Sequence, residues 1–183
     1  MDVPTLCLAV LSRGPASGYE IRKAFGDGPF AHIHEASFGS IYPSLRRLEE
    51  QGLAEGAAEQ QDGRPDKRVY RITDSGRATL RRALMAPPRP DRVRSDALVV
   101  LCFAHLVPAE TVATALDLYL AQHRAVLSLL TGDGCADCAT PGERFVHGFG
   151  VAIYQAAVSY IENHRAAFVD ATAATPAGGD HRS

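Results

Sequence analysis

Short apolar stripes at helical spacing, separated by breaks rich in Gly and Pro, organise the first fifty residues. Residues 4–12 carry such a stripe and end at an Arg-Gly-Pro turn, which predicts a first helix. Ser17 and, three residues later, Glu20 have the spacing of a capping box. This spacing predicts that a short second helix begins at Ser17 and ends at the Gly- and Pro-rich segment that follows Phe25.

A third helix with two unlike faces is predicted next. Ile41, Leu45 and Leu48 repeat at i, i+4 and i+7, so that one face is apolar. Pro43 is tolerated near the first turn of a helix, where its missing N–H has no partner to lose, and this places the helix start at residues 37–39. We expect the apolar face to lie in a core and the opposite face to carry polar groups.

A hairpin and a fourth helix complete the N-terminal pattern. Segments 53–61 and 67–73 have mixed polarity and flank residues 62–66, an Asp-Gly-Arg-Pro-Asp sequence typical of a hairpin tip. Thr73 is expected to cap the fourth helix. The Pro- and Arg-rich residues 85–94 then form a connector.

Three further helices are expected after the connector, over residues 95–105, 109–130 and 143–169, with a loop between the second and the third. The sequence therefore predicts a mainly α protein with a small β-hairpin. The expected N-terminal domain spans 1–84 and the helical C-terminal domain spans 95–170. A flexible tail is expected at 171–183.

Composition is that of a globular chain, with 46% hydrophobic and 22% charged residues among 183. No apolar run approaches the length of a membrane span, and the first ten residues lack the pattern of a secretion signal, so we expect a cytoplasmic protein without a membrane partner. Residues 1–84 carry 12 Lys and Arg against 11 Asp and Glu. Net charge alone therefore does not indicate nucleic-acid binding. A prediction of DNA binding has to rest on the positions of the charged residues.

The order helix, helix, helix, hairpin, helix over about 80 residues is typical of a winged helix-turn-helix, whose third helix enters the DNA major groove. Short polar or planar groups on the first turns of that helix suit base recognition. The side chains that fit are those of Ser37, Ser40, Tyr42, Ser44 and Arg46. For Tyr42, packing against the second helix is the alternative.

The wing and the second helix supply candidate contacts to the DNA backbone. Arg64, Lys67 and Arg68 form a basic edge suited to phosphates or to a narrow minor groove, although such charges also serve to keep a strand edge soluble. Tyr19 and Lys23 lie on the second helix, which crosses the backbone in helix-turn-helix proteins. We expect them to position the protein on DNA.

Three segments, LAVLSRGPASGYEIRKAF, SFGSIYPSLRRLEEQGL and DGRPDKRVYRITDSGR, resemble the PadR family of bacterial transcriptional regulators over residues 5–82. The resemblance implies a DNA-binding regulator, with repression as the usual mode, and strengthens the assignment of Tyr19. It also implies that the C-terminal helices form a dimer. PadR-like proteins include sensors of phenolic acids and of larger aromatic compounds, but this sequence does not identify an effector. Asp66 stands where the family has a more basic wing, which implies weaker non-specific affinity for DNA.

Two apolar stripes in the C-terminal helices support a homodimer, because three helices do not readily bury both. The residues expected at the dimer interface are Leu116, Leu120, Leu127, Phe149, Ile153, Ala156 and Tyr160. The alternative is that both stripes pack onto the N-terminal domain of the same chain. Candidates for an effector pocket are Phe103, Tyr119, Phe145 and Tyr154, for which ordinary helix packing is the alternative.

Cysteine usage adds little chemistry. Cys7 and Cys102 lie in apolar runs, and we expect both to be buried. Cys135 and Cys138 form a single CxxC, which is half of a zinc site, with His123 and His147 as conceivable further ligands. We expect no metal, no cofactor and no catalytic constellation.

These patterns predict a sequence-specific DNA-binding regulator that acts as a homodimer on an inverted-repeat operator, and the resemblance implies a ligand-responsive repressor. The half-sites are expected about one helical turn apart. The alternative from another class is a winged-helix module that binds protein, and the near-neutral charge of residues 1–84 is its best support.

Overall fold

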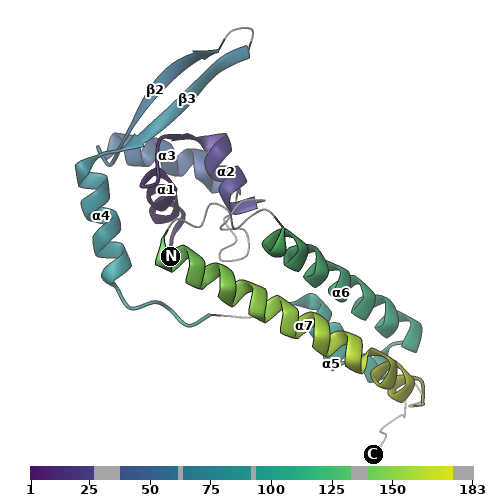
Figure 1. Cartoon of the computed structure of the whole chain (residues 1–183). Coiled ribbons are helices and arrows are strands. Elements are labelled where there is room, and N and C mark those ends of the chain that lie inside the picture. The colour runs from purple at the N-terminus through teal and green to yellow at the C-terminus, as the bar shows by residue number, and fades with distance from the viewer. Residues whose placement is uncertain (27–37, 62–63, 92–93, 133–139, 175–183) are drawn as a thin grey trace, which may run out of the picture. The chain divides into compact units, whose positions relative to one another are not determined.

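The computed structural model describes residues 1–26, 38–61, 64–91, 94–132 and 140–174. The chain divides into two compact units, Met1–Asp91 and Arg92–Ser183. Helices dominate both units, and a small antiparallel sheet lies in the first (Figure 1). The predicted fold class, mainly α with a small hairpin, is confirmed.

The first unit follows the predicted order of elements, with two short additions. Its elements are α1 (Val3–Leu11), β1 (Ala16–Ser17), α2 (Gly18–Gly26), η1 (Phe38–Ser40), α3 (Ile41–Glu50), β2 (Ala54–Gln61), β3 (Arg64–Ile72) and α4 (Asp74–Met85). The additions are β1 and the 3-10 turn η1. Strand β1 pairs antiparallel with β3, placing Ala16 opposite Tyr70 and Ser17 opposite Val69, and gives a sheet with the order β1-β3-β2.

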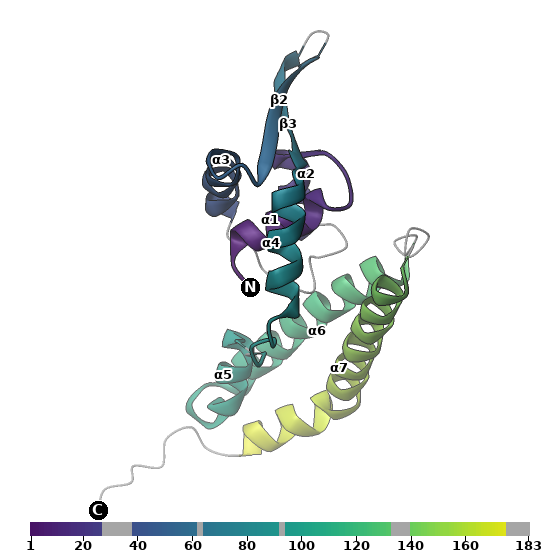
Figure 2. The same ribbon diagram turned by 90° about the vertical axis from the view of Figure 1, so that its left-hand side faces the viewer.

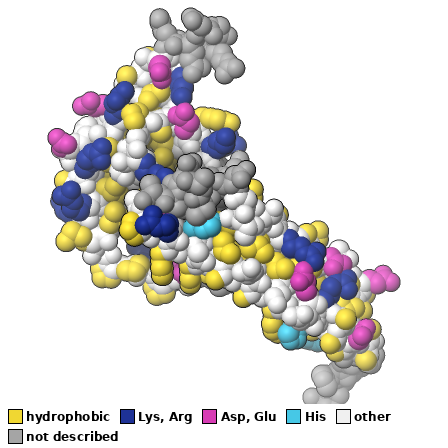
Figure 3. Space-filling view, viewed as in Figure 1, with side chains coloured by type: hydrophobic (Ala, Val, Ile, Leu, Met, Phe, Trp, Pro, Cys, Tyr) yellow, Lys and Arg dark blue, Asp and Glu magenta, His cyan; other side chains and the backbone are white. Residues whose placement is uncertain are grey.

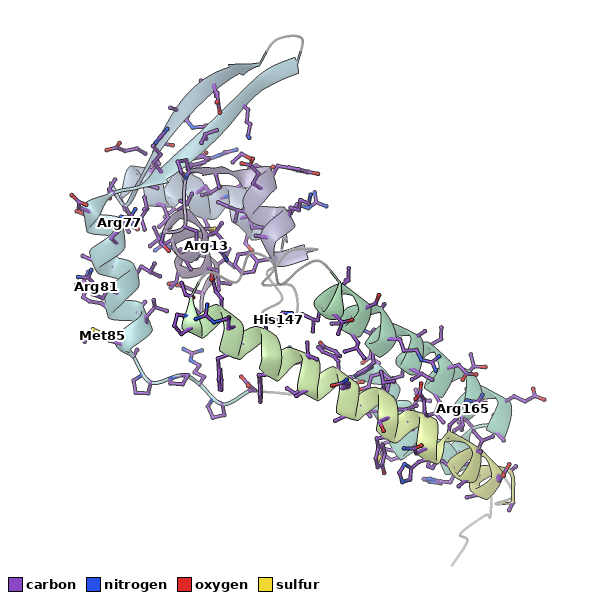
Figure 4. The ribbon with its side chains drawn as sticks, viewed as in Figure 1. Arg13, Arg77, Arg81, Met85, His147 and Arg165 are labelled. Atoms are coloured by element: carbon purple, nitrogen blue, oxygen red, sulfur yellow. The ribbon has the colours of Figure 1, made fainter. Side chains whose placement is uncertain are left out.

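The predicted helix caps are confirmed by their hydrogen bonds. The Ser17 N–H donates to Glu20 Oε2 at 2.8 Å, and the Glu20 N–H donates to Ser17 Oγ at 3.3 Å, which are the two bonds of a capping box. At α4 the Gly76 N–H donates to Thr73 Oγ1 at 3.0 Å. Arg77, one residue on, donates to the carbonyl of Ser12 after α1, at 3.5 Å (Figure 4).

The hairpin is longer than the sequence pattern predicted. Strand β3 begins at Arg64, which pairs with Gln61 of β2, so Arg64 lies in the strand and not in a five-residue tip. The register shifts between Glu59 and Gln61, which marks a bulge or irregularity near the end of the hairpin. Lys67 and Arg68 of the predicted basic edge pair with Glu59 and Ala58 of β2, and Arg64 lies beyond the register shift.

A single apolar cluster holds the first unit together. It is built by α1, which packs against α3 and α4, and by the inner faces of α2 and the sheet. Its members include Cys7, Leu8, Leu11, Ile21, Ile41, Leu45, Leu48 and Tyr70. The apolar stripe of α3 is buried as predicted, and Cys7 is buried as well. Burying each large aliphatic side chain contributes about 1.5–3 kcal/mol before the entropy of ordering is counted.

The second unit consists of α5 (Asp96–Cys102), η2 (Ala104–Leu106), α6 (Ala109–Thr131) and α7 (Pro141–Ala174). Helices α6 and α7 lie side by side (Figures 1 and 2). Arg165 of α7 makes a two-bond contact with the Asp117 carboxylate of α6, at 2.6 and 2.7 Å, which lowers the pKa of that carboxyl group. His147 Nε2 lies 2.7 Å from the carbonyl oxygen of Leu130 (Figure 4).

Several predicted boundaries and burials in this unit were wrong. The expected helix 95–105 is interrupted after Cys102, whose side chain is exposed and not buried. Helix α7 continues to Ala174, so residues 171–174 of the expected tail are helical. Leu116 and Leu120 are buried with Val112 and Ile161 inside the unit and are therefore not available to a second chain, because α7 covers their stripe.

Within the described part of the chain, no helix has both the length and the apolarity that crossing a membrane requires.

Candidate nucleic-acid interface

Helix α3 presents a polar face because its apolar face is fixed in the core. Ile41, Leu45 and Leu48 are each at most 1% exposed. Tyr42 is 49% exposed, and Arg46, one turn further on, is also exposed. Positions i and i+4 of a helix lie on one face. The helix thus presents an aromatic hydroxyl and a guanidinium side by side to solvent. Its buried apolar stripe fixes the rotation of the helix about its axis.

The three serines predicted on this face differ in how the structure places them. Ser44 is only 8% exposed, so it is not presented to a groove, and its assignment to base recognition was wrong. It follows Ile41 by three positions and precedes Leu48 by four, so the helical period itself places it on the flank of the apolar stripe. Ser40 is half-buried at the start of α3. Ser37 lies outside the described residues.

Tyr42 serves as a packing residue while half of its surface stays exposed. A Cβ atom placed on Gly18, the first residue of α2, would lie 2.5 Å from Cε1 of the Tyr42 ring. The ring therefore rests on bare backbone at the start of α2, the contact that the packing alternative predicted. Since only glycine permits this approach, Gly18 helps to set how α2 and α3 cross.

Helix α2 exposes Tyr19 and Lys23 one turn apart on the same face. Tyr19 is among the most exposed large side chains of the unit. Both residues lie where the sequence placed them, on the helix before α3. Their assignment as contacts to the DNA backbone stays a prediction.

The wing cations are bound to carboxylates of the two helices, a feature that sequence reasoning missed. Lys67 Nζ lies 2.8 Å from Glu20 Oε1, and Arg68 Nη2 lies 2.5 Å from Glu49 Oε1. The Gly56 N–H also donates to Glu49 Oε1, at 3.3 Å. These partners are 47 and 19 positions apart in sequence, so no local pattern could have indicated them.

The two ion pairs also shift the pKa values of residues that form them. The hydrogen bond from Lys67, together with those from Ser17, lowers the pKa of the Glu20 carboxyl group to about 2. The same bond raises the pKa of Lys67, and the bond to Glu49 raises the pKa of Arg68. These shifts favour the charged forms of Glu20, Lys67 and Arg68. Figure 3 shows the wider pattern, in which Lys and Arg are interspersed with Asp and Glu over the first unit.

The residues predicted for an effector pocket are only partly brought together. Tyr119 and Tyr154 flank His123, with ring centroids 4.2 and 5.5 Å from the imidazole. Phe145 stacks instead on Phe149, at 6.3 Å. Phe103 lines a shallow hollow of about 520 Å³ along α5, together with Arg94, Ser95, Asp96, Leu98, Val99 and Cys102.

Other predicted features fall outside the described residues or lack support within them. The Arg64 side chain is not described, and Cys135 and Cys138 lie in a segment that the structure does not describe. Among the residues that it does describe, no three His, Cys, Asp or Glu side chains are grouped to hold a metal ion. His147 bonds to a backbone carbonyl, and His123 does the same through the carbonyl of Tyr119.

Comparison with known sequences gives a family match within the first unit. Residues 7–82 match the model of the Transcriptional regulator PadR-like family. A regulator from Mycobacterium tuberculosis, "Probable transcriptional regulator Rv1176c", is 38% identical over 92 residues, which are 50% of this chain and 48% of that protein. "Negative transcriptional regulator PadR" of Bacillus subtilis is 27% identical over 126 residues, covering 68% of this chain and 69% of that one. The match thus spans about half the length of the first relative and about two thirds of the second.

Comparison with solved structures extends over both units. The PadR-like transcriptional regulator BC1756 from Bacillus cereus superposes with a TM-score of 0.79 at 27% identity, over 92% of this chain and 94% of that one. Bacillus subtilis PadR in complex with operator DNA superposes with a TM-score of 0.73 at 24% identity, over 90% and 98%. The chain therefore has the fold of the PadR-like winged-helix proteins.

Proposed function

Because the chain carries the PadR-like transcriptional regulator domain at residues 7–82, we propose that the protein is a sequence-specific DNA-binding repressor that acts as a homodimer. The observation that carries the proposal is the exposed polar face of α3, where Tyr42 and Arg46 stand one turn apart above a fully buried apolar stripe. A helix that recognises bases in the major groove needs such a packed face. If the helix could rotate about its axis, it would not hold a side chain against the edge of a nucleotide base.

In this proposal Arg46 reads a base and Tyr19 and Lys23 bind phosphates. A guanidinium can form two parallel hydrogen bonds with the major-groove edge of guanine, whereas an exposed lysine or tyrosine on the preceding helix meets the sugar-phosphate chain. Ser40 and the hydroxyl of Tyr42 are further candidates for base or phosphate contact.

Binding to a labelled duplex of the protein's own promoter region, compared with a scrambled duplex, tests the proposal. Wild type should prefer the promoter at physiological salt. Arg46→Ala should reduce that preference by about 1–3 kcal/mol, the usual value of a base-reading contact. Arg81→Ala is the matched control, because it removes the same charge from an exposed position on α4. Equal binding of both duplexes by wild type would refute sequence-specific recognition.

The proposed homodimer forms through the face of α7 that stays exposed within one chain. Phe149 is 60% exposed, Ile153, Ala156 and Tyr160 follow it on the helix, and all three are exposed too. Leu127 of α6 is half-buried. An apolar row of this kind is unusual on a monomer, and a second copy would bury it against its own equivalent.

Sedimentation velocity tests the dimer. Wild type should sediment as a dimer at micromolar concentration, and Phe149→Glu should shift it to a folded monomer with weaker operator binding, because the second half-site no longer binds intramolecularly. Leu116→Ala is the contrast, since it should lower stability by about 2–5 kcal/mol through a core cavity. A monomeric wild type would contradict the proposal.

Repression and response to an aromatic effector are the finer parts of the proposal. Bacillus subtilis PadR is by name a negative regulator, and one structure of that protein contains p-coumaric acid. In this chain the cluster of Tyr119, His123 and Tyr154 offers aromatic faces and hydroxyl groups to a ligand of that class. Addition of p-coumaric acid should release the promoter duplex from wild type and not from Tyr154→Ala. No release at millimolar acid would refute this effector class.

A protein-binding winged helix is the second candidate, and one observation favours it. Lys67 and Arg68, two cations of the wing, are already paired with carboxylates. A module that bound protein alone would show no affinity for either duplex at low salt, whereas the repressor should bind the scrambled duplex weakly and lose it as salt increases.

A further inference from the structure

We propose that Glu20 and Glu49 restrain the wing from binding DNA of arbitrary sequence, and so act as specificity-determining residues. The inference rests on the proposed DNA-binding function and assigns a role to two acidic residues, one on α2 and one on α3. Each glutamate neutralises one wing cation, Lys67 or Arg68, in the free protein.

The two ion pairs clamp one strand from both sides. Lys67 and Arg68 are consecutive residues of β3, so their side chains leave opposite faces of the pleated strand. Glu20 belongs to α2 and Glu49 to α3, the two helices of the helix-turn-helix. The base of the wing is thereby tied to both helices at once. Lys67 and Arg68 each contact a carboxylate while part of their side chains stays exposed to solvent.

Both carboxylates are fixed by a second bond to the backbone. Glu20 Oε2 accepts from the Ser17 N–H at 2.8 Å and from Ser17 Oγ at 2.9 Å, while its other oxygen holds Lys67. Glu49 Oε1 accepts from the Gly56 N–H as well as from Arg68. An exposed ion pair alone contributes little, because its partners swing freely. The additional hydrogen bonds hold these two carboxylates in place when Lys67 or Arg68 moves towards a phosphate.

A phosphate that approaches the wing therefore competes with a carboxylate that stays in place. Non-specific affinity comes from cations that release counterions from the DNA, about one unit of salt slope for each phosphate contact. A cation held by a fixed glutamate contributes less of this sequence-independent affinity. Base contacts made by α3 are unaffected, so the ratio of specific to non-specific binding increases.

Glu20→Gln and Glu49→Gln each remove the negative charge and keep the size of the side chain and one acceptor oxygen, so they test the effect of the charge alone. Glutamine at position 20 preserves the capping box, and glutamine at position 49 keeps an acceptor for the Gly56 N–H. Glu50→Gln is the control, since it removes the same charge from the next residue of α3, an exposed side chain that makes no ion pair with any described residue.

The readout is binding to a scrambled and to a promoter duplex between 50 and 200 mM salt. For Glu20→Gln and Glu49→Gln, affinity for the scrambled duplex should increase and fall about 3- to 4-fold more over this range than that of wild type, as one added phosphate contact requires. The preference for the promoter should decrease. Glu50→Gln should behave like wild type.

A double-mutant cycle assigns the effect to the pair. The gain from Glu20→Gln should disappear when Lys67→Gln is present and should persist with Arg68→Gln. The reverse holds for Glu49→Gln.

Two outcomes overturn the inference while leaving the proposed function intact: a wild type that prefers its promoter with glutamine variants that match Glu50→Gln, or variants that bind both duplexes more weakly. If neither wild type nor any variant binds a duplex at 50 mM salt, the DNA-binding function itself is refuted.

Discussion

The phenol ring of Tyr42 covers the backbone of Gly18, so that a Cβ atom on Gly18 would lie 2.5 Å from Cε1 and 3.0 Å from Cδ1 of the ring. The contact joins the first turn of α3 to the first residue of α2. A half-exposed residue that is a candidate for DNA contact thus takes its position from a glycine on another helix.

Replacement of Gly18 by Ala should displace the Tyr42 ring and weaken promoter binding about as much as Tyr42→Ala does. The stability cost should stay near the low end of the 1–3 kcal/mol typical of overpacking, because a half-exposed ring can move into solvent. Binding assays and thermal unfolding measure the two effects. Gly39→Ala controls for the substitution in the unfolding measurement, since no atom of the described residues lies within 4 Å of its Cβ position. Unchanged promoter binding by Gly18→Ala would contradict the assigned role of Tyr42.

Replacement of Gly76 by Ala should be far more costly. Its Cβ would lie 2.1 Å from the carbonyl oxygen of Leu53, a backbone atom that also accepts the Thr73 N–H at 3.1 Å and is thereby held in place. We expect a loss of about 3 kcal/mol or more, measured by urea unfolding. Ser75→Ala, at an exposed neighbouring position, should cost much less. Equal stability of the two variants would show that the turn before α4 relaxes freely.

Stability should fall in acid partly through Glu20. Its carboxyl pKa is lowered from 4.5 to about 2, mainly by the hydrogen bond from Lys67. A lowered folded-state pKa stabilises the protein above pH 4.5 and loses that contribution as the pH falls towards 2. Glu20→Gln should therefore lose less stability than wild type between pH 4.5 and 2, as measured by denaturant unfolding at each pH. Parallel curves for wild type and Glu20→Gln would contradict the assigned pKa.

The two described cysteines should differ sharply in reactivity. Burial raises the pKa of the Cys7 thiol to about 12, so almost no thiolate forms at pH 8, whereas Cys102 is exposed. In a Cys135→Ser/Cys138→Ser background, a thiol reagent should modify one cysteine in the native protein and the second only after denaturation. Mass spectrometry of the modified peptide identifies which one reacts first. Rapid labelling of Cys7 in the native protein would indicate that α1 opens readily.

Local interactions were determined by the sequence alone. The capping box of Ser17 and Glu20, the cap at Thr73 and the buried stripe of α3 all join residues within a few positions of one another, so the helical period is sufficient to find them. The same period also indicates that Ser44 lies beside that stripe.

Long-range pairing was decided only by the tertiary structure. An apolar stripe shows that a face is to be covered and does not show what covers it, so the pairing of α6 with α7 was needed to place Leu116 and Leu120 inside one chain and to leave Phe149 exposed. The two-residue strand β1 is too short for any periodic signal. The contacts of Lys67 with Glu20 and of Arg68 with Glu49 depend on how the wing returns past α2 and α3, because Coulomb attraction acts through space and leaves no periodic trace along the chain.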